Sequence, residues 1–300
     1  MAIRVLMLDL GDTLVHDTVV FPHVADALTA LSKIEAARGE HLVTCLVSDF
    51  KTPTPPPTQT KIAAIFSEYV ELLDQFGLRK FFEPVQDRVT LSAHAGVAKP
   101  DRRIFEKAIE RLGVRAELGE CLFITEDAAH LAACSALGME TLRFGSTEGF
   151  TDWAEAPLLV AAKISGLHSP NMATALGAWL HSVHGMQLMD VEASPSANII
   201  RARVREVCAL PSSELGGEKL HAELPVTIEL RVSESGRVER MVQEGPSDEA
   251  MTDATHLIKT LRAHRQIAPE QGPMPAGTTH QFVTDAQDRK VVKRRRFSAV

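Results

Sequence analysis

The first half of the chain alternates short apolar runs with longer segments whose apolar residues recur at helical spacing. Continuous apolar runs of this length are typical of strands buried on both faces. Expected strands occupy residues 3–8, 42–47, 89–92, 121–125 and 140–144, and expected helices occupy residues 22–37, 61–77, 101–113 and 127–137. This alternation predicts a doubly wound, Rossmann-like α/β fold, in which a parallel sheet carries helices on both faces.

The second half has a different pattern, and we expect it to form a smaller α+β domain of no recognised family. Residues 225–243 alternate apolar and polar positions on both sides of Ser235-Gly236, which is a hairpin signal. The other expected elements are helices at 151–165, 172–185 and 247–265, strands at 187–192 and 197–208, and a second hairpin at 280–297. With a boundary at GLHSPN (166–171), the sequence predicts an α/β domain at 1–165 and an α+β domain at 166–300.

Composition narrows the class of protein without identifying it. The 300 residues carry a net charge of −7 and only 5% aromatics, which argues against a nucleic-acid partner or an anionic membrane surface. The apolar run near the N-terminus is too short to span a bilayer. The four cysteines contain no CxxC pair, which favours a reduced, cytoplasmic protein with buried thiols.

Polar residues stand where several of the expected strands end. Asp9 follows the first apolar run, Ser48 follows the second, and Glu126 and Asp127 follow Thr125. Ligands of open parallel sheets bind at the carboxyl ends of the strands. A buried, unpaired carboxylate is costly, so Asp9 at the end of an apolar strand indicates a site more than a structural need.

Four segments of the first half resemble motifs of the haloacid dehalogenase-like (HAD) hydrolases, whose most common members are magnesium-dependent phosphatases. The segments are LDLGDTLV (8–15), LVTCLVSDF (42–50), GVAKPDRRIFEKAIERLGV (96–114) and CLFITEDAAHLAACSALGMETL (121–142). The resemblance covers about residues 1–150 and implies a HAD-like sheet. Large cap insertions of the family have no counterpart, because the intervals after Asp12 and between Ser48 and Lys99 are short.

The resemblance also implies a reaction. Asp9 is expected to attack phosphorus and form an aspartyl phosphate, which divides one difficult displacement into two steps. Lys99 and Mg²⁺ would offset the charge of the transferred group, and Ser48 would donate a hydrogen bond to a phosphate oxygen. The implied Mg²⁺ ligands are Asp9, the backbone carbonyl of Gly11, and either Glu126 or Asp127.

Two motifs depart from the family pattern. The family's phosphatases carry a second aspartate two positions after the nucleophile, where it acts as general acid and base, but this chain has Gly11 there and an acid at Asp12. Asp12 replaces that group only if Gly11 bends the loop into a conformation that other residues dislike; otherwise it makes local hydrogen bonds in the turn. In the fourth motif Asp127 is also a candidate helix cap, and His130 suits a softer metal or a surface position.

We therefore expect a Mg²⁺-dependent HAD-type phosphohydrolase with an open site. Its substrate would be a phosphorylated small molecule or a phosphorylated protein or peptide. The alternative is a weakly active or inactive HAD scaffold that binds a protein partner or a second copy through its C-terminal domain; a dehalogenase is a third reading. The basic tail fits either contact with phosphate or an acidic partner, or a protected edge strand, and consists of Arg289, Lys290, Lys293, Arg294, Arg295 and Arg296.

Overall fold

The computed structural model describes the chain except for residues 1, 37–39, 52–57, 193–197, 272–274 and 295–300. The chain divides into two compact units, the first made of Met1–Val183 with Ser233–Arg237 and the second of His184–Val232 with Val238–Val300. Helix α8 (Pro170–His184) thus lies almost wholly in the first unit, although we expected a boundary near residue 166. The amide of Asn171 explains this, because it accepts from the Glu35 N–H at 2.9 Å and donates to the Glu35 carbonyl at 2.7 Å.

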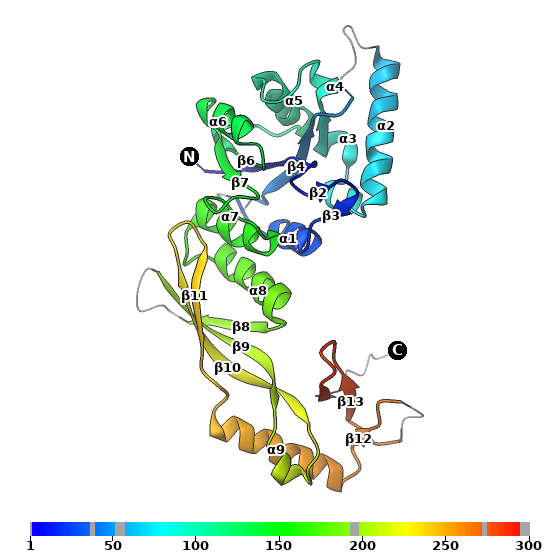
Figure 1. Cartoon of the computed structure of the whole chain (residues 1–300), viewed down its shortest axis with the longest axis vertical. Helices are drawn as coiled ribbons and strands as arrows, with labels where there is room; N and C mark the ends of the chain where they lie inside the picture. The colour runs from blue at the N-terminus through cyan, green and yellow to red at the C-terminus, as the bar shows by residue number, and fades with distance from the viewer. Residues whose placement is uncertain (1, 37–39, 52–57, 193–197, 272–274, 295–300) are drawn as a thin grey trace. The chain divides into compact units, whose positions relative to one another are not determined.

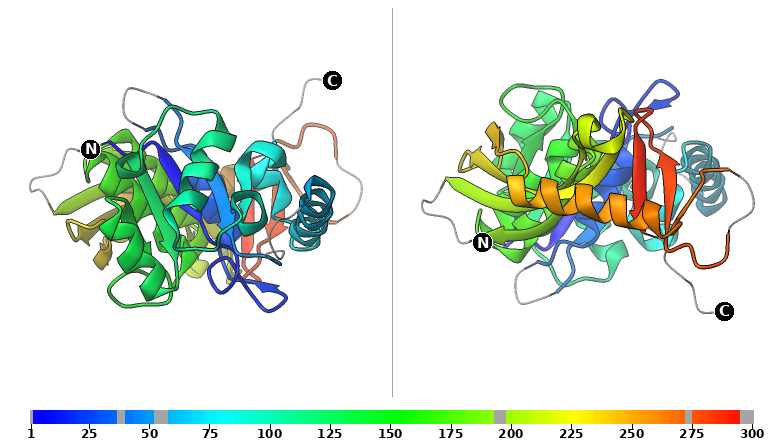
Figure 2. Two further views of the ribbon diagram at one scale, coloured as in Figure 1. Left: turned by 90° about the horizontal axis from the view of Figure 1, so that it is seen from above. Right: turned by 90° about the horizontal axis from the view of Figure 1, so that it is seen from below.

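The first unit contains a five-stranded parallel sheet in the order β5-β4-β1-β6-β7. Its strands are β1 (Val5–Leu8), β4 (Val43–Ser48), β5 (Val89–Leu91), β6 (Cys121–Thr125) and β7 (Glu140–Arg143). All five strands predicted from the apolar runs are confirmed. Helices α5 and α6 lie on one side of this sheet, and α1 and α7 on the other (Figure 1), while the strands run side by side in the view from above (Figure 2, left).

The longer helices of this unit also follow the predicted order. They are α1 (Val24–Leu31), α2 (Gln59–Gln75), α5 (Arg102–Leu112), α6 (Ala128–Ala136), α7 (Ala156–Ser165) and α8. Helix α1 is shorter than expected, because the chain leaves the helix after Leu31 and the Leu42 N–H bonds to the Ile34 carbonyl at 3.1 Å. The proline-rich segment at 52–57 lies outside the described residues, and Thr58 caps α2 by accepting from the Lys61 N–H.

Short elements fill the connections between the strands and the longer helices. The hairpin of β2 (Val15–His16) and β3 (Val19–Val20) follows β1. The others are η2 (Arg79–Phe82), α3 (Val85–Arg88), α4 (Ser92–Ala95), η3 (Leu118–Glu120) and η4 (Trp153–Glu155). The interval between Ser48 and Lys99 therefore holds α2 and several single turns besides β5.

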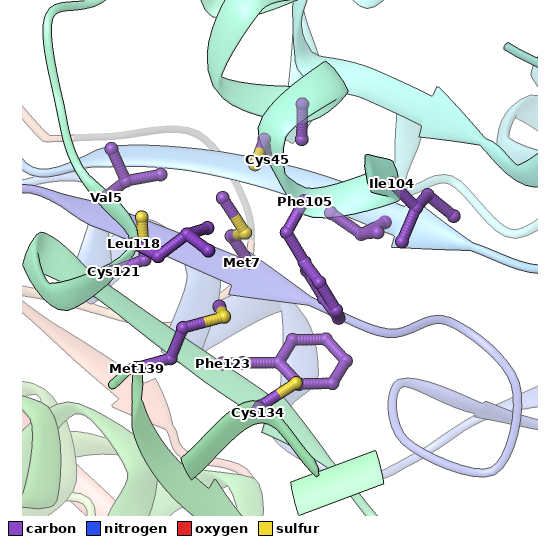
Figure 3. Close-up of a cluster of buried hydrophobic side chains, with 12 residues drawn as sticks. Val5, Met7, Cys45, Ile104, Phe105, Leu118, Cys121, Phe123, Cys134 and Met139 are labelled. Atoms are coloured by element: carbon purple, nitrogen blue, oxygen red, sulfur yellow. The ribbon is translucent and has the colours of Figure 1, made fainter. Parts of the chain in front are cut away.

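Alternate residues of β1 face opposite sides of the sheet and are buried on both. Val5 and Met7 join a cluster with β4, β6, α5 and α6, whose side chains Figure 3 shows. In that cluster the Phe105 and Phe123 rings meet edge to face with centroids 5.3 Å apart. Leu6 and Leu8 are buried on the opposite side. A strand covered on both faces holds its C-terminal end firmly, which matters for Asp9 immediately after it.

The second unit contains a mixed sheet in the order β12-β13-β14-β10-β9-β8, with β11 paired to β10. Its strands are β8 (Gln187–Glu192), β9 (Ile199–Ala209), β10 (His221–Val232), β11 (Val238–Gln243), β12 (Ile267–Ala268), β13 (His280–Thr284) and β14 (Lys290–Arg294). The first predicted hairpin is confirmed, and so is the second over residues 280–294; residues 295–297 lie outside the described residues. Helix α9 (Asp248–Ala263), capped by the Ser247 hydroxyl, lies across these strands (Figure 2, right) and packs Ile258 against Leu224 and its neighbours. The turn η5 (Ser212–Leu215) joins the same cluster.

The basic tail makes ion pairs inside the second unit. Lys290 pairs with Glu218, and Lys293 pairs with Glu223 at 3.1 Å. Arg289 pairs with Asp285 at 2.7 Å, whereas Arg295 and Arg296 lie outside the described residues. No helix within the described part of the chain combines the length and apolar character needed to cross a bilayer.

Candidate functional site

Three polar residues lie at the carboxyl edge of the parallel sheet. Leu8 pairs with Leu46 of β4 and with Ile124 of β6, so Asp9, Ser48 and Thr125 lie close to the same level. The Asp9 N–H extends the pairing by bonding to the Ile124 carbonyl at 3.0 Å. The register of the sheet therefore brings together residues that are far apart in the sequence.

Asp9 forms a buried ion pair with Lys99. The Lys99 ammonium contacts Asp9 Oδ2, and the exposed fractions of the two residues are 7% and 6%. The Leu10 N–H donates to Asp9 Oδ1 at 2.8 Å, and the backbone N–H of Lys99 is held by Asp49 at 3.0 Å. Burial raises the pKa of Asp9 above its ordinary value, while the charge and hydrogen bond of Lys99 act in the opposite direction.

Glu126 stands beside this pair and is oriented by two hydroxyls. Glu126 Oε2 accepts from Thr13, and it lies 3.0 Å from Thr125 Oγ1. The same Thr125 oxygen lies 3.1 Å from Asp9 Oδ2, so the two carboxylates flank a single hydroxyl. The negative charge of Glu126 contributes to the raised pKa of Asp9, as expected for neighbouring carboxylates.

Asp127 has a different environment. Its Oδ1 accepts from the N–H groups of Ala129 at 2.7 Å and His130 at 3.1 Å, so it caps α6. These donors, the His130 N–H first, lower the pKa of Asp127. His130 Nδ1 lies 3.7 Å from Asp127 Oδ2. Of the two acids that follow Thr125, only Glu126 is directed at Asp9.

Asp12 points away from Asp9. Its backbone has a positive φ of 51°, and its Oδ1 lies 2.6 Å from His16 Nδ1. The side chain is 62% exposed. Gly11 has no positive φ, and a Cβ at this position would meet no atom within 4 Å. The special bend of Gly11 that would turn Asp12 toward Asp9 is therefore absent.

A pocket of about 430 Å³ opens next to this edge of the sheet. Its walls come from the loops after β1 and β4 and from one face of α2, and include Gly11, Asp12, Ser48, Phe50, Leu72 and Phe76. Ser48 is buried and belongs to this lining. The arrangement offers a bound molecule apolar walls on the side of α2 and polar groups on the side of the strand ends.

The site offers hard oxygen ligands for a cation. Within the described ranges, no three His, Cys, Asp or Glu side chains converge as a metal centre, and the carboxylates directed at one point are Asp9 and Glu126. Mg²⁺ usually binds through one or two carboxylates and keeps several waters, so this donor set fits it. The repulsion between Asp9 and Glu126 is a second reason for a cation there.

Thr13 and Thr125 are site residues that the sequence did not identify. The sequence also did not identify Tyr69, whose hydroxyl pKa responds to Ser48 and Asp9. Thr13 and Thr125 are fully buried polar residues that orient Glu126. The position of Thr125 could have identified it, because Thr125 is the last residue of a strand whose C-terminal end was expected to carry the site. Tyr69 had no such signal, because it occupies the buried face of an ordinary amphipathic helix.

Comparisons with known proteins add little information about the fold or the function. No family model matches the chain, and no curated protein matches it. Among solved structures, an uncharacterized protein from Corynebacterium glutamicum ATCC 13032 Kitasato is 18% identical and has a TM-score of 0.32, over 49% of this chain and 88% of that one. A HAD-superfamily hydrolase from Ehrlichia chaffeensis is 10% identical and has a TM-score of 0.32, over 52% of this chain and 94% of that one. Both likenesses are weak and extend over about half of the chain.

Proposed function

We propose that the first unit is a HAD-type, Mg²⁺-dependent phosphohydrolase that works through an aspartyl phosphate. The observation that carries this proposal is the buried Asp9–Lys99 pair at the end of a central parallel strand, with Glu126 beside it. A carboxylate and an ammonium placed together at this edge, next to a pocket, are the groups that phosphoryl transfer requires.

In the proposed reaction an Asp9 oxygen forms a bond to phosphorus while the bond from phosphorus to the leaving oxygen breaks. Water then attacks the aspartyl phosphate, releases inorganic phosphate and restores the Asp9 carboxylate. Lys99 offsets the negative charge of the transferred group in both steps, and Ser48 donates to one of its oxygens. Thr13 and Thr125 keep Glu126 oriented throughout.

The residues that would hold Mg²⁺ are Asp9, Glu126 and the backbone carbonyl of Gly11. When bound, the ion supplies positive charge beside the transferring phosphoryl group. Asp127 is left to cap α6, because its carboxylate is already committed to two backbone N–H groups.

The leaving group receives no proton from position 11, because Gly11 has no side chain. Asp12 does not fill this role in its present orientation toward His16. We therefore assign the enzyme to phosphates whose leaving groups need little protonation, such as aryl and acyl phosphates.

Release of phosphate from p-nitrophenyl phosphate in the presence of Mg²⁺ tests the proposal. We expect wild-type activity, and its loss in Asp9→Asn, whose amide oxygen can still accept from Lys99 and so preserves the packing. Asp12→Asn, changed in the same loop, is the matched control and should retain activity. Equal rates for Asp9→Asn and the wild type would rule out Asp9 as the nucleophile.

The transposed Gly11-Asp12 pair also favours a second candidate, a HAD scaffold with little or no activity that binds a partner through the second unit. In that case calorimetry would detect no Mg²⁺ binding, and the full chain would co-purify with a stable partner. Tight Mg²⁺ binding that Glu126→Gln weakens would argue against the scaffold function.

A further inference from the structure

Tyr69, the only tyrosine in the chain, has a buried hydroxyl with no hydrogen-bond partner among the described residues. The residue is 1% exposed and lies on α2. A buried hydroxyl left without a partner costs about 1–3 kcal/mol, so each one in a folded protein needs an explanation. A phenylalanine would fill the same space without this cost, which indicates that the hydroxyl itself has a use.

The packing of α2 places the phenol near the end of β4. The Tyr69 ring meets the Phe50 ring edge to face with centroids 5.1 Å apart, and Phe50 stands two residues after Ser48. Leu72 and Phe76, three and seven positions after Tyr69 and so on the same face of α2, line the pocket together with Ser48.

The polar groups that act on the phenol belong to the proposed active site. Burial raises the pKa of Tyr69 far above its ordinary value, the Ser48 hydroxyl opposes this shift, and the Asp9 carboxylate adds to it. The phenol therefore stays protonated and remains a hydrogen-bond donor. Its oxygen is closed off from solvent, whereas Ser48 belongs to the pocket lining. This favours a role exerted through Ser48 over direct contact with a ligand.

We propose that Tyr69 is a positioning residue, which donates to Ser48 Oγ and thereby leaves the hydrogen of Ser48 free to be donated to an anionic oxygen of a bound phosphate. The inference rests on the proposed function and adds a residue to its phosphate site. A serine hydroxyl has one hydrogen and two lone pairs, so a donor from behind fixes the direction of that single hydrogen. The hydroxyl of Tyr69 gains its partner when Ser48 is oriented by the phosphate.

Binding of inorganic phosphate to the full chain, measured by calorimetry with Mg²⁺ present, tests the inference. Tyr69→Phe keeps the ring and its contact with Phe50, and we expect it to bind phosphate about tenfold more weakly than the wild type. Ser48→Ala should weaken binding at least as much, and the double variant should bind no more weakly than Ser48→Ala alone. Additive losses would indicate two independent effects and would overturn the positioning role.

One control variant and two distinct outcomes separate this inference from the proposed function. Thr255→Val removes a buried hydroxyl, bonded to the Met251 carbonyl, from the second unit, and should leave phosphate affinity unchanged. If the wild type binds phosphate and Tyr69→Phe binds it equally well, the inference fails and the proposed function stands. If the wild type binds no phosphate, both fail.

A measurement on the wild type avoids any effect of Tyr69→Phe on folding. Saturation with phosphate should perturb the near-ultraviolet absorption of the single tyrosine, and Ser48→Ala should reduce that perturbation. A wild-type protein that binds phosphate without changing the tyrosine signal would contradict the proposed coupling.

Discussion

The side chain at position 11 determines which leaving groups the proposed enzyme can expel. Gly11 has an ordinary φ, and the space around its Cβ position is open to 4 Å, so the fold does not require glycine there. An aspartate at this position would stand two residues after Asp9. The phosphatases that this segment resembles carry their general acid at the same spacing.

We predict that Gly11→Asp folds normally and hydrolyses alkyl phosphates about 10²-fold faster than the wild type, because a well-placed general acid contributes about 10²–10⁴-fold. Hydrolysis of p-nitrophenyl phosphate should change much less, since its leaving group needs little protonation. Steady-state rates on the two substrates provide the comparison. An unchanged ratio between them would show that the lack of an acid does not limit the reaction.

At the residue level, the sequence predicts most where topology alone decides which residues lie near one another. Asp9, Ser48 and Glu126 stand at the ends of neighbouring parallel strands, so an apolar run and its last residue were enough to bring them together. The direction of Asp12 depends on the single contact with His16 and on its own positive φ, and neither follows from a pattern. Which of Glu126 and Asp127 faces Asp9 likewise depended on which side chain accepts from the first N–H groups of α6.

At the scale of elements, the short helix α4 carries a half-buried histidine that should make folding sensitive to acid. His94 Nδ1 accepts from the Leu91 N–H at 3.0 Å, so the ring must be neutral to serve this bond. Its ring also meets Phe66 with centroids 5.2 Å apart. Burial, with the nearby charges of Arg111 and Lys107, lowers the pKa of His94 to about 4.

We predict that the first unit loses stability as the pH falls from 6.5 toward 4, because in this window the unfolded chain binds a proton at His94 that the folded chain does not. Above pH 6.5 the histidine is neutral in both states and the contribution is complete. With allowance for partial solvent screening we expect a loss of about 1 kcal/mol between pH 7 and pH 5. Urea unfolding can be followed by the fluorescence of Trp153 and Trp179, both in the first unit.

His94→Asn should reduce this pH dependence, since its amide oxygen can accept from the Leu91 N–H and does not titrate. His256→Asn, at an exposed position of α9, is the matched control and should unfold like the wild type at both pH values. The same slope in wild type and His94→Asn would assign the acid sensitivity to other groups.

Elements were predictable to the extent that their own residues decide them. Strands β1, β4 and β6 consist mostly of buried apolar residues, and helix α5 begins at the Asp101 cap and ends at Gly113, so local sequence suffices. Helix α1 ends at Leu31 although the apolar spacing continues, because Ile34 and Glu35 bond to distant residues instead. Single turns such as α4 have too few residues to show the helical repeat of apolar positions.

At the scale of the whole molecule, each of the two units consists of two separate segments of the chain. The turn Ser233–Arg237 joins β10 to β11 but belongs to the first unit. Arg237 donates to the carbonyls of Thr147, at 2.8 Å, and Gly149. A sequence pattern shows that such a turn exists and cannot show which unit receives it, because the carbonyl partners carry no side-chain signature.

Gly236 makes this turn a sensitive point of the first unit. Its φ is +94°, a conformation that residues with a Cβ rarely adopt, and a Cβ there would lie 2.6 Å from the backbone oxygen of Leu158 in α7. We predict that Gly236→Ala destabilises the first unit by about 1–3 kcal/mol, because a backbone atom cannot move aside as a flexible side chain can. Urea unfolding followed by tryptophan fluorescence measures the change. Gly245→Ala, with no atom within 4 Å of its Cβ position and no positive φ, is the control and should differ little from the wild type. If the two variants unfold alike, the turn adds no stability to the first unit.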